Sequence, residues 1–117
     1  MSGRSPRRGD IWYANTPGQP DDPHQPRPVL IISEDIRNSH SDDVIVVPLF
    51  SDGRLGPTRV VISAGMGGIR HESVAFCEEV TTLDHDFLYE GPLGRPVPRA
   101  ALEKVVDAVY FAVGGEA

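Results

Sequence analysis

The sequence Arg27-Pro28-Val29-Leu30-Ile31-Ile32-Ser33 places four apolar residues, three of them β-branched, directly after a proline. A continuous apolar run of this length favours a buried strand, because β-branched side chains lose rotamer freedom in a helix and pack well on a pleated sheet. The run Val44-Ile45-Val46-Val47 has the same character and predicts a second buried strand. The polar stretch 33–43 between them can hold a helical turn.

Two further strands are expected at a similar spacing, over residues 58–62 and 73–77. The sequence Gly65-Met66-Gly67-Gly68 between them is typical of a turn. Upstream, residues 9–13 contain an Ile-Trp-Tyr sequence that marks the beginning of the folded part. Repeated short strands with glycine-rich turns predict a small barrel or sandwich.

The end of the chain changes from the strand period to the helix period. Apolar side chains after Pro98 recur at helical spacing and form one stripe, made of Leu102, Val105, Val106, Val109 and Val113. Pro98 suits the first turn of a helix, and Gly114-Gly115 suits its end. The expected fold class is therefore mainly β (α+β), with one C-terminal α-helix.

Length and composition indicate one domain. A chain of 117 residues, 39% of them hydrophobic, can bury a single core without metal or disulfide support. Residues 1–8 hold three arginines and no acid, so we expect a flexible basic tail there and a single domain over residues 9–117. No apolar run approaches the roughly 20 residues that span a bilayer. The lone cysteine, Cys77, excludes an internal disulfide, and we expect a soluble cytoplasmic protein.

Arg27 is the residue most suited to chemistry. Pro28 pushes Arg27 into an extended backbone, and the strand that follows gives it a rigid base from which its planar fork can reach a phosphate. The preceding stretch, residues 16–28, holds five prolines and predicts a long loop. Ser51 supplies a hydroxyl at the expected end of the second strand. Phosphate-binding loops and zinc motifs are absent, and the four histidines are expected to be solvated surface residues.

Several blocks of this sequence, in this order, resemble the MazF/PemK toxin family. The first two blocks are Arg8-Gly9-Asp10-Ile11-Trp12 and residues 27–33. They are followed by Val46-Val47-Pro48-Leu49, by residues 67–75 and by Leu93-Gly94-Arg95. The similarity is collinear over nearly the whole chain, and the order and spacing of the blocks make it more specific than any block alone.

The resemblance implies a fold, an activity and partners. Members are homodimers with an SH3-like antiparallel barrel and a C-terminal helix, and each is neutralised by a cognate, MazE-like antitoxin. Most cleave single-stranded RNA at short sequences without a metal or cofactor, which stops translation and growth. The implied function is therefore that of the toxin of a type II toxin–antitoxin system and of an endoribonuclease. Attack by the 2′-hydroxyl would leave a cyclic phosphate and a free 5′-hydroxyl.

The same resemblance assigns the catalytic residues. The family's essential arginine matches Arg27, and the threonine that usually follows the Val-Pro-x sequence is replaced by Phe50, with Ser51 as the nearest hydroxyl. A step of one residue along a strand turns a side chain to the opposite face, so Ser51 faces Arg27 only if a bulge near Pro48 realigns it. Catalysis is assigned to Arg27, with help from Ser51 or from a loop histidine such as His24.

RNA-binding residues are also implied by the resemblance. Relatives carry Gln and Arg after the Ser-Val-Ala strand, where this chain has Glu78-Glu79. A glutamate can accept a hydrogen bond from the amino group of cytosine or guanine. The expected RNA-binding residues are Asp22, His24, Gln25, Phe50, Glu78 and Glu79.

The formal net charge of −6 opposes this function, because phosphate binding normally needs a basic surface. A short RNA needs only a locally positive groove, which Arg27, Arg54, Arg59 and Arg70 could line. We therefore expect weak, salt-sensitive RNA binding. The alternative is a non-catalytic toxin related to CcdB that acts by binding a protein such as gyrase, and the substituted hydroxyl at Phe50 keeps this alternative open.

Overall fold

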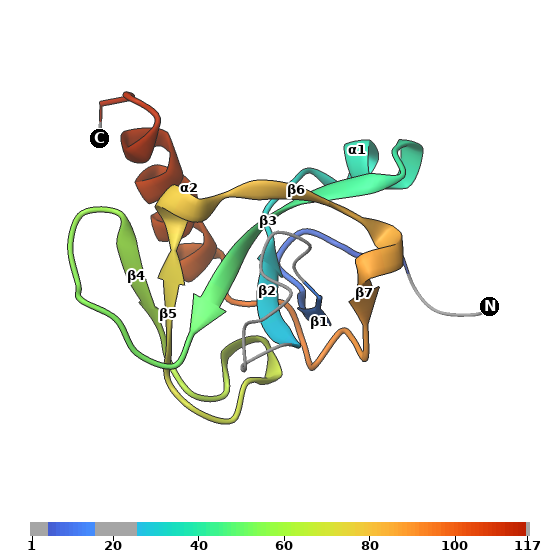
Figure 1. Ribbon diagram of the computed structural model, residues 1–117, viewed down its shortest axis with the longest axis horizontal. Helices are drawn as coiled ribbons and strands as arrows, with labels where there is room; N and C mark the ends of the chain where they lie inside the picture. Colours follow the sequence, from blue (N-terminus) through green and yellow to red (C-terminus); the bar gives the residue numbers. More distant parts are fainter. Residues whose placement is uncertain (1–4, 16–25, 117) are drawn as a thin grey trace.

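The computed structural model describes residues 5–15 and 26–116 of the 117-residue chain, and the described part is an antiparallel sheet with a helix at its C-terminal end (Figure 1). The strands are β1 (Ile11–Ala14), β2 (Arg27–Ile31), β3 (Asp43–Phe50), β4 (Arg59–Ile62), β5 (Ser73–Phe76), β6 (Thr81–Asp84) and β7 (Leu88–Tyr89). The helices are α1 (Asp35–His40) and α2 (Arg99–Ala112), with 3₁₀ turns η1 (Met66–Gly68), η2 (Cys77–Glu79) and η3 (His85–Phe87).

β3 organises the sheet by pairing with three other strands. The order along the main path is β4-β5-β3-β2-β1-β7, and β6 also pairs with β3. On one side of β3, Val46 is the last residue opposite β6 and Leu49 is the first opposite β5. Pro48 lies at this change of partner, where its missing N–H costs no ladder hydrogen bond.

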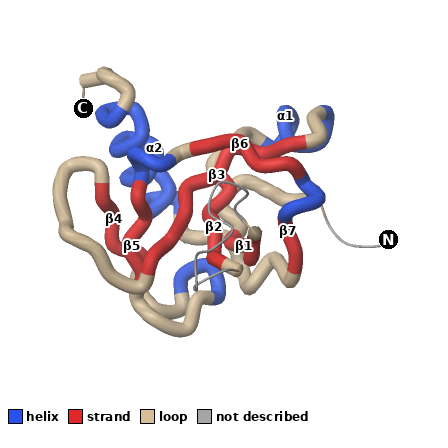
Figure 2. The backbone as a smooth tube through the Cα atoms, in the orientation of Figure 1, coloured by secondary structure: helices blue, strands red, loops and turns tan. Residues whose placement is uncertain are grey.

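The predicted fold class is confirmed, since the described elements are mainly strands and end in one long helix (Figure 2). The hydrogen-bonded path has two ends, at β4 and β7. The strands of the described ranges therefore form an open sheet and do not close into a continuous barrel.

The continuous apolar runs are explained by burial on both faces of the sheet. Leu30, Val47 and Leu49 pack in a core on the side of α2. Val29 and Val46 pack on the opposite side, in a second cluster that includes Trp12. Burying a side chain of this size contributes about 1.5–3 kcal/mol, so neither face of β2 or β3 tolerates a polar residue at these positions.

The C-terminal helix forms as predicted. Pro98 precedes it without a side-chain cap, and the backbone N–H of Gly114, at φ 101°, donates to the carbonyl of Phe111 beyond its end. Leu102 and Val105 are buried against the core, whereas Val113 at the end of the stripe is 70% exposed. Within residues 5–15 and 26–116, no helix combines the length and apolarity needed to cross a membrane.

The glycine-rich stretch forms the turn expected between two strands, here β4 and β5. Gly68 has φ +90°, a conformation that L side chains rarely adopt. A side chain at Gly68 would also collide with the backbone of Leu93. The turn therefore packs directly against residues 93–94, and Gly68 and Leu93 together form a wall of the pocket described below.

The basic segment predicted as a tail lies partly outside the described residues. In the described part, the backbone N–H of Arg7 donates to the Asp10 carboxylate over 3.0 Å. Arg8 Nε donates to the carbonyl of Ile32 over 3.0 Å and lies 3.1 Å from a carboxylate oxygen of Glu34. These contacts hold residues 7 and 8 against the end of β2 and the beginning of α1.

Candidate active site

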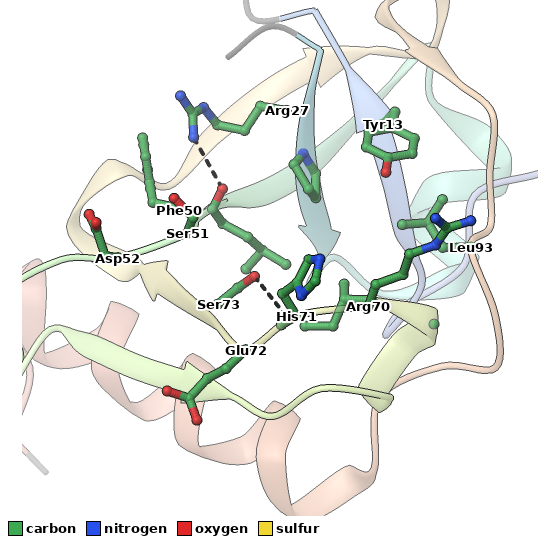
Figure 3. Close-up of a pocket in the computed structure, with 14 residues that line it drawn as sticks. Tyr13, Arg27, Phe50, Ser51, Asp52, Arg70, His71, Glu72, Ser73 and Leu93 are labelled. Carbon is green, nitrogen blue, oxygen red and sulfur yellow. Dashed lines mark hydrogen bonds between the residues drawn. The ribbon is translucent and has the colours of Figure 1, made fainter.

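A pocket of about 550 Å³ opens where β2 begins and β3 ends, beside the turn that precedes β5. Figure 3 shows Arg27, Phe50 and Ser51 at one side of this pocket, with Tyr13 and Arg70 at the other. These side chains come from segments that are far apart in the sequence. The fold therefore gathers the main chemistry-bearing groups of the chain at one end of the sheet.

Arg27 is the first residue of β2, and its side chain is only 7% exposed. Its Nη1 donates a hydrogen bond of 3.3 Å to the carbonyl of Leu49. The guanidinium carbon lies 3.9 Å from the centre of the Phe50 ring, which is a cation–π contact. Arg27 therefore has a defined orientation at the edge of the pocket.

Phe50 and Ser51 lie at the end of β3, and both line the pocket. Phe50 is the last residue of the strand, and its ring stacks on that of Phe76 with centroids 4.1 Å apart. Ser51 is exposed and follows the strand, so the two-residue alternation of strand side chains does not govern its direction. The structure thus brings Arg27, Phe50 and Ser51 to one pocket.

Glu78 and Glu79 lie on η2, and neither lines the pocket. The Glu78 carboxylate accepts hydrogen bonds from Arg59 Nε, over 2.8 Å, and from the hydroxyl of Thr58, over 3.0 Å. Its hydrogen bonds to Arg59 lower the pKa of Glu78 to about 2. Glu79 is exposed, and the other three expected RNA-binding residues, Asp22, His24 and Gln25, lie outside the described residues.

Among the pocket residues that sequence reasoning missed, Tyr13 and His71 have side chains suited to RNA chemistry. His71 is exposed, as expected of a surface histidine, but it also lines the pocket, and its place after the glycine-rich turn and beside Arg70 was a usable signal for this. Arg27 and Arg70 line the pocket as the groove hypothesis required, whereas Arg54 and Arg59 do not. The lining also includes Asp52 and Glu72, so two carboxylates balance the two guanidinium groups.

Potential metal ligands are scattered across the fold. Across the ranges that the structure describes, no three His, Cys, Asp or Glu side chains gather in a way that could hold a metal ion. The polar groups of the pocket are instead guanidinium, hydroxyl, imidazole and carboxylate groups. Such a set can bind a phosphodiester and move protons.

Comparison with known proteins now identifies the class of protein. A family model described as "PemK-like, MazF-like toxin of type II toxin-antitoxin system" matches residues 7–112, a range that includes every strand and both helices that the structure describes. The chain is therefore a toxin of the type II class. It belongs to the PemK/MazF family.

Two curated relatives carry enzyme names. The chain is 36% identical over 89 residues to the endoribonuclease MazF of Staphylococcus saprophyticus, and the match covers 72% of each chain. It is 33% identical over 81 residues to the endoribonuclease EndoA of Bacillus subtilis, which covers 67% of this chain and 70% of the relative.

Solved structures share the fold over nearly the whole chain. An endoribonuclease from a mycobacterial species superposes with a TM-score of 0.78 at 26% identity, covering 97% of this chain and 96% of the other. A mycobacterial endoribonuclease in complex with its cognate antitoxin gives a TM-score of 0.76 at 28% identity, and the match covers 93% of this chain and 95% of the other. The Deinococcus radiodurans MazE–MazF complex, at 20% identity and a TM-score of 0.77, supports the fold alone.

Proposed function

We propose that this chain is an endoribonuclease toxin that cleaves single-stranded RNA with Arg27 at the scissile phosphate. The observation that carries the proposal is the pocket, whose lining includes a buried, oriented arginine together with a serine hydroxyl and a histidine imidazole. The names of the relatives in Staphylococcus saprophyticus and Bacillus subtilis support the same activity.

The proposed reaction uses the RNA's own 2′-hydroxyl as the nucleophile. The 2′-oxygen forms a bond to the adjacent phosphorus while the bond to the 5′-oxygen breaks, which leaves a 2′,3′-cyclic phosphate and a free 5′-hydroxyl. The Arg27 guanidinium neutralises charge that develops on the non-bridging phosphate oxygens. Its burial strengthens this effect, because charges interact more strongly where water is excluded.

Two proton transfers accompany this step: the 2′-hydroxyl loses a proton, and the leaving 5′-oxygen gains one. His71 lines the pocket, and an imidazole is the commonest side chain for such transfers at neutral pH. We assign the transfers to His71 and assign to Ser51 a hydrogen bond that holds the phosphate. Tyr13 provides an aromatic ring on which a base can stack, and Arg70 provides a second phosphate contact.

The partners proposed for the chain follow the family. We propose a homodimer that a cognate antitoxin neutralises, which the mycobacterial complex with its antitoxin supports by analogy. We place the protein in the cytoplasm, where its mRNA substrate is found. Its single cysteine, Cys77, is free and buried, as suits a reducing compartment.

The test is cleavage of a long single-stranded RNA by the purified protein in EDTA, with the 5′-hydroxyl ends mapped by sequencing. Wild-type protein should cut at a limited set of sequences, and Arg27→Ala should not. Arg99→Ala is the matched control, because Arg99 is 90% exposed on α2 and does not line the pocket. An inert wild-type protein, or equal cleavage by Arg27→Ala, overturns the proposal.

The non-catalytic alternative draws on two features, the phenylalanine at the position of the family's hydroxyl and the acidic net charge of the chain. It predicts that expression of Arg27→Ala arrests growth as strongly as expression of the wild type, and that gyrase is retained by the immobilised protein. The endoribonuclease proposal predicts that growth continues when Arg27→Ala is expressed. Comparing the two expression strains therefore separates the hypotheses.

A further inference from the structure

Four side chains from four neighbouring strands form a continuous row on one face of the sheet. Val29 lies opposite Pro48 in the β2–β3 ladder, and the same register continues to Arg27 and Phe50, the outermost residues of these strands. Side chains directly opposite each other share a face and lie within contact distance. The ladder therefore places Arg27 against Phe50.

The row continues through β5 to β4. Phe50 lies opposite Val74, so Phe76, two residues further along β5, is its diagonal neighbour on the same face. Phe76 in turn lies directly opposite Arg59 of β4. We call Arg27, Phe50, Phe76 and Arg59 the stacked row.

Distances show that the stacked row is in contact throughout. The Phe50 and Phe76 centroids are 4.1 Å apart, and the guanidinium carbon of Arg59 lies 3.6 Å from the centre of the Phe76 ring. Arg27 and Phe76 each lie about 4 Å from the centre of the Phe50 ring. Two groups so close to one ring cannot share a face, so they cover opposite faces of Phe50.

The far end of the row is anchored. Arg59 donates to both carboxylate oxygens of Glu78, and its Nη1 donates to the carbonyl of Arg54 over 3.1 Å. Arg59 therefore holds Phe76, and Phe76 supports Phe50 from the side away from Arg27. An aromatic ring fixed in this way is a rigid platform for a guanidinium group.

We infer that Phe50 is a positioning residue that holds the Arg27 guanidinium in the orientation needed at the phosphate. This inference rests on the proposed function only in the role that it gives to Arg27. Because both faces of Phe50 are covered, a base cannot stack on this ring without displacing Arg27 or Phe76. Phe50 therefore acts on RNA through Arg27, in contrast to the direct RNA contact expected from the sequence.

The kinetic test compares Phe50→Leu with Phe50→Tyr. Leucine keeps the bulk but removes the ring face, so kcat should fall about tenfold or more while KM changes less than twofold. Tyrosine keeps the ring and should recover most of kcat. Phe87→Leu is the matched control, because Phe87 lies on η3, outside the stacked row and the pocket. A raised KM with an unchanged kcat would mean that Phe50 contacts RNA directly, which overturns the inference.

A second measurement does not depend on activity. The ring current of Phe50 should shift the NMR signal of the Arg27 Nε–H group upfield, and Phe50→Leu should remove this shift while Phe50→Tyr keeps it. If Phe50→Leu does not fold, Phe76→Leu is used, because an unsupported Phe50 ring should broaden or reduce the same shift. An Arg27 signal that neither variant moves overturns the inference. A wild type inert toward RNA, with the shift present and lost as described, contradicts only the proposed function.

Discussion

Arg59 of β4 and Glu78 of η2 form a two-pronged ion pair at the end of β5. Arg59 Nε lies 3.0 Å from one carboxylate oxygen and 2.8 Å from the other. Hydrogen bonding to this carboxylate raises the pKa of Arg59 and lowers that of Glu78, so both groups stay charged at neutral pH. Arg59, which the sequence suggested as a residue of the RNA groove, is therefore already paired with Glu78.

The ion pair makes stability depend on pH. The pKa of Glu78 is lowered to about 2 from an ordinary 4.5. The contribution of the Glu78 carboxylate to the free energy of unfolding is thus fully present above pH 4.5 and is lost as the pH falls toward 2. Glu78→Gln should lower the melting temperature near pH 7, and the difference from wild type should shrink at acidic pH. Glu103→Gln, in an exposed pair with Arg99, is the control, and a pH-independent difference would contradict the prediction.

Arg27 should be sensitive even to a change that conserves its charge. Losing a donor aimed at a developing oxyanion costs about 10²–10³ in kcat, so Arg27→Ala should lose at least a hundredfold. Arg27→Lys should recover only part of this, because lysine lacks the planar fork that both stacks on Phe50 and donates to the Leu49 carbonyl. Single-turnover cleavage of one RNA measures both, and full activity in Arg27→Lys would refute the requirement for a fork.

Substitutions of His71 and of Ser51 should have different effects on the pH dependence of RNA cleavage. General acid–base catalysis contributes about 10²–10⁴, so His71→Asn should reduce kcat on this scale and flatten one limb of the pH–rate profile. Ser51→Ala should lower kcat without removing that limb. His40→Asn on α1 is the control, since His40 does not line the pocket. An unchanged profile in His71→Asn would return the proton transfer to Ser51 or to His24.

The salt dependence of RNA binding should show whether Arg70 contacts a phosphate. Each phosphate neutralised by a cation contributes about 0.7 to the slope of log affinity against log salt for a single strand. Arg70→Gln should weaken RNA binding and reduce this slope by about one contact, as measured by fluorescence anisotropy between low and physiological salt. Arg99→Gln should leave the slope unchanged. Affinity that barely responds to salt in the wild type would mean that the pocket does not bind phosphate.

Cys77 should be unreactive in the folded protein. Its thiol is fully buried, and burial raises its pKa to about 12. Since the thiolate is the reactive form, a thiol reagent at pH 8 should label native protein very slowly and should label one group per chain in denaturant. Rapid labelling of native protein would show that the core around β5 opens readily.

Local sequence patterns were sufficient to predict the main strands, the C-terminal helix and the glycine-rich turn of this fold. Most of the apolar runs 29–32 and 44–47 is buried in β2 and β3, because alternate side chains pack on the two faces of the sheet. Ile32, just after β2, and Ile45 are only partly buried. The stripe after Pro98 predicted α2 because helical period is a local property. The glycine-rich turn before β5 was equally readable, since clustered glycines mark a turn locally, whereas its close contacts with the Leu93 backbone and the Ile11 side chain were not.

The pocket could be predicted only in part. Arg27 and Ser51 stand at strand ends, where position along the chain indicates a functional site. Tyr13 comes from β1, and nothing in its local sequence shows that the fold brings it into the pocket that Arg27 lines. His71 has a local signal in its place after the glycine-rich turn, but that signal does not link it to Arg27. Glu78 was expected to contact RNA, but the expectation could not include its ion pair with Arg59, which joins residues 19 apart in the chain.

By itself the sequence determined the strand-rich class, the terminal helix and the arginine at the beginning of β2, because periodicity and proline act over a few residues. Only the tertiary structure decided the register of β2 on β3 and of β4 on β5, which places Arg27 on Phe50 and Arg59 on Phe76. Register depends on how whole strands pack, and shifting it by one residue would turn every side chain to the other face. The neighbours of the proposed catalytic arginine are therefore a property of the folded sheet.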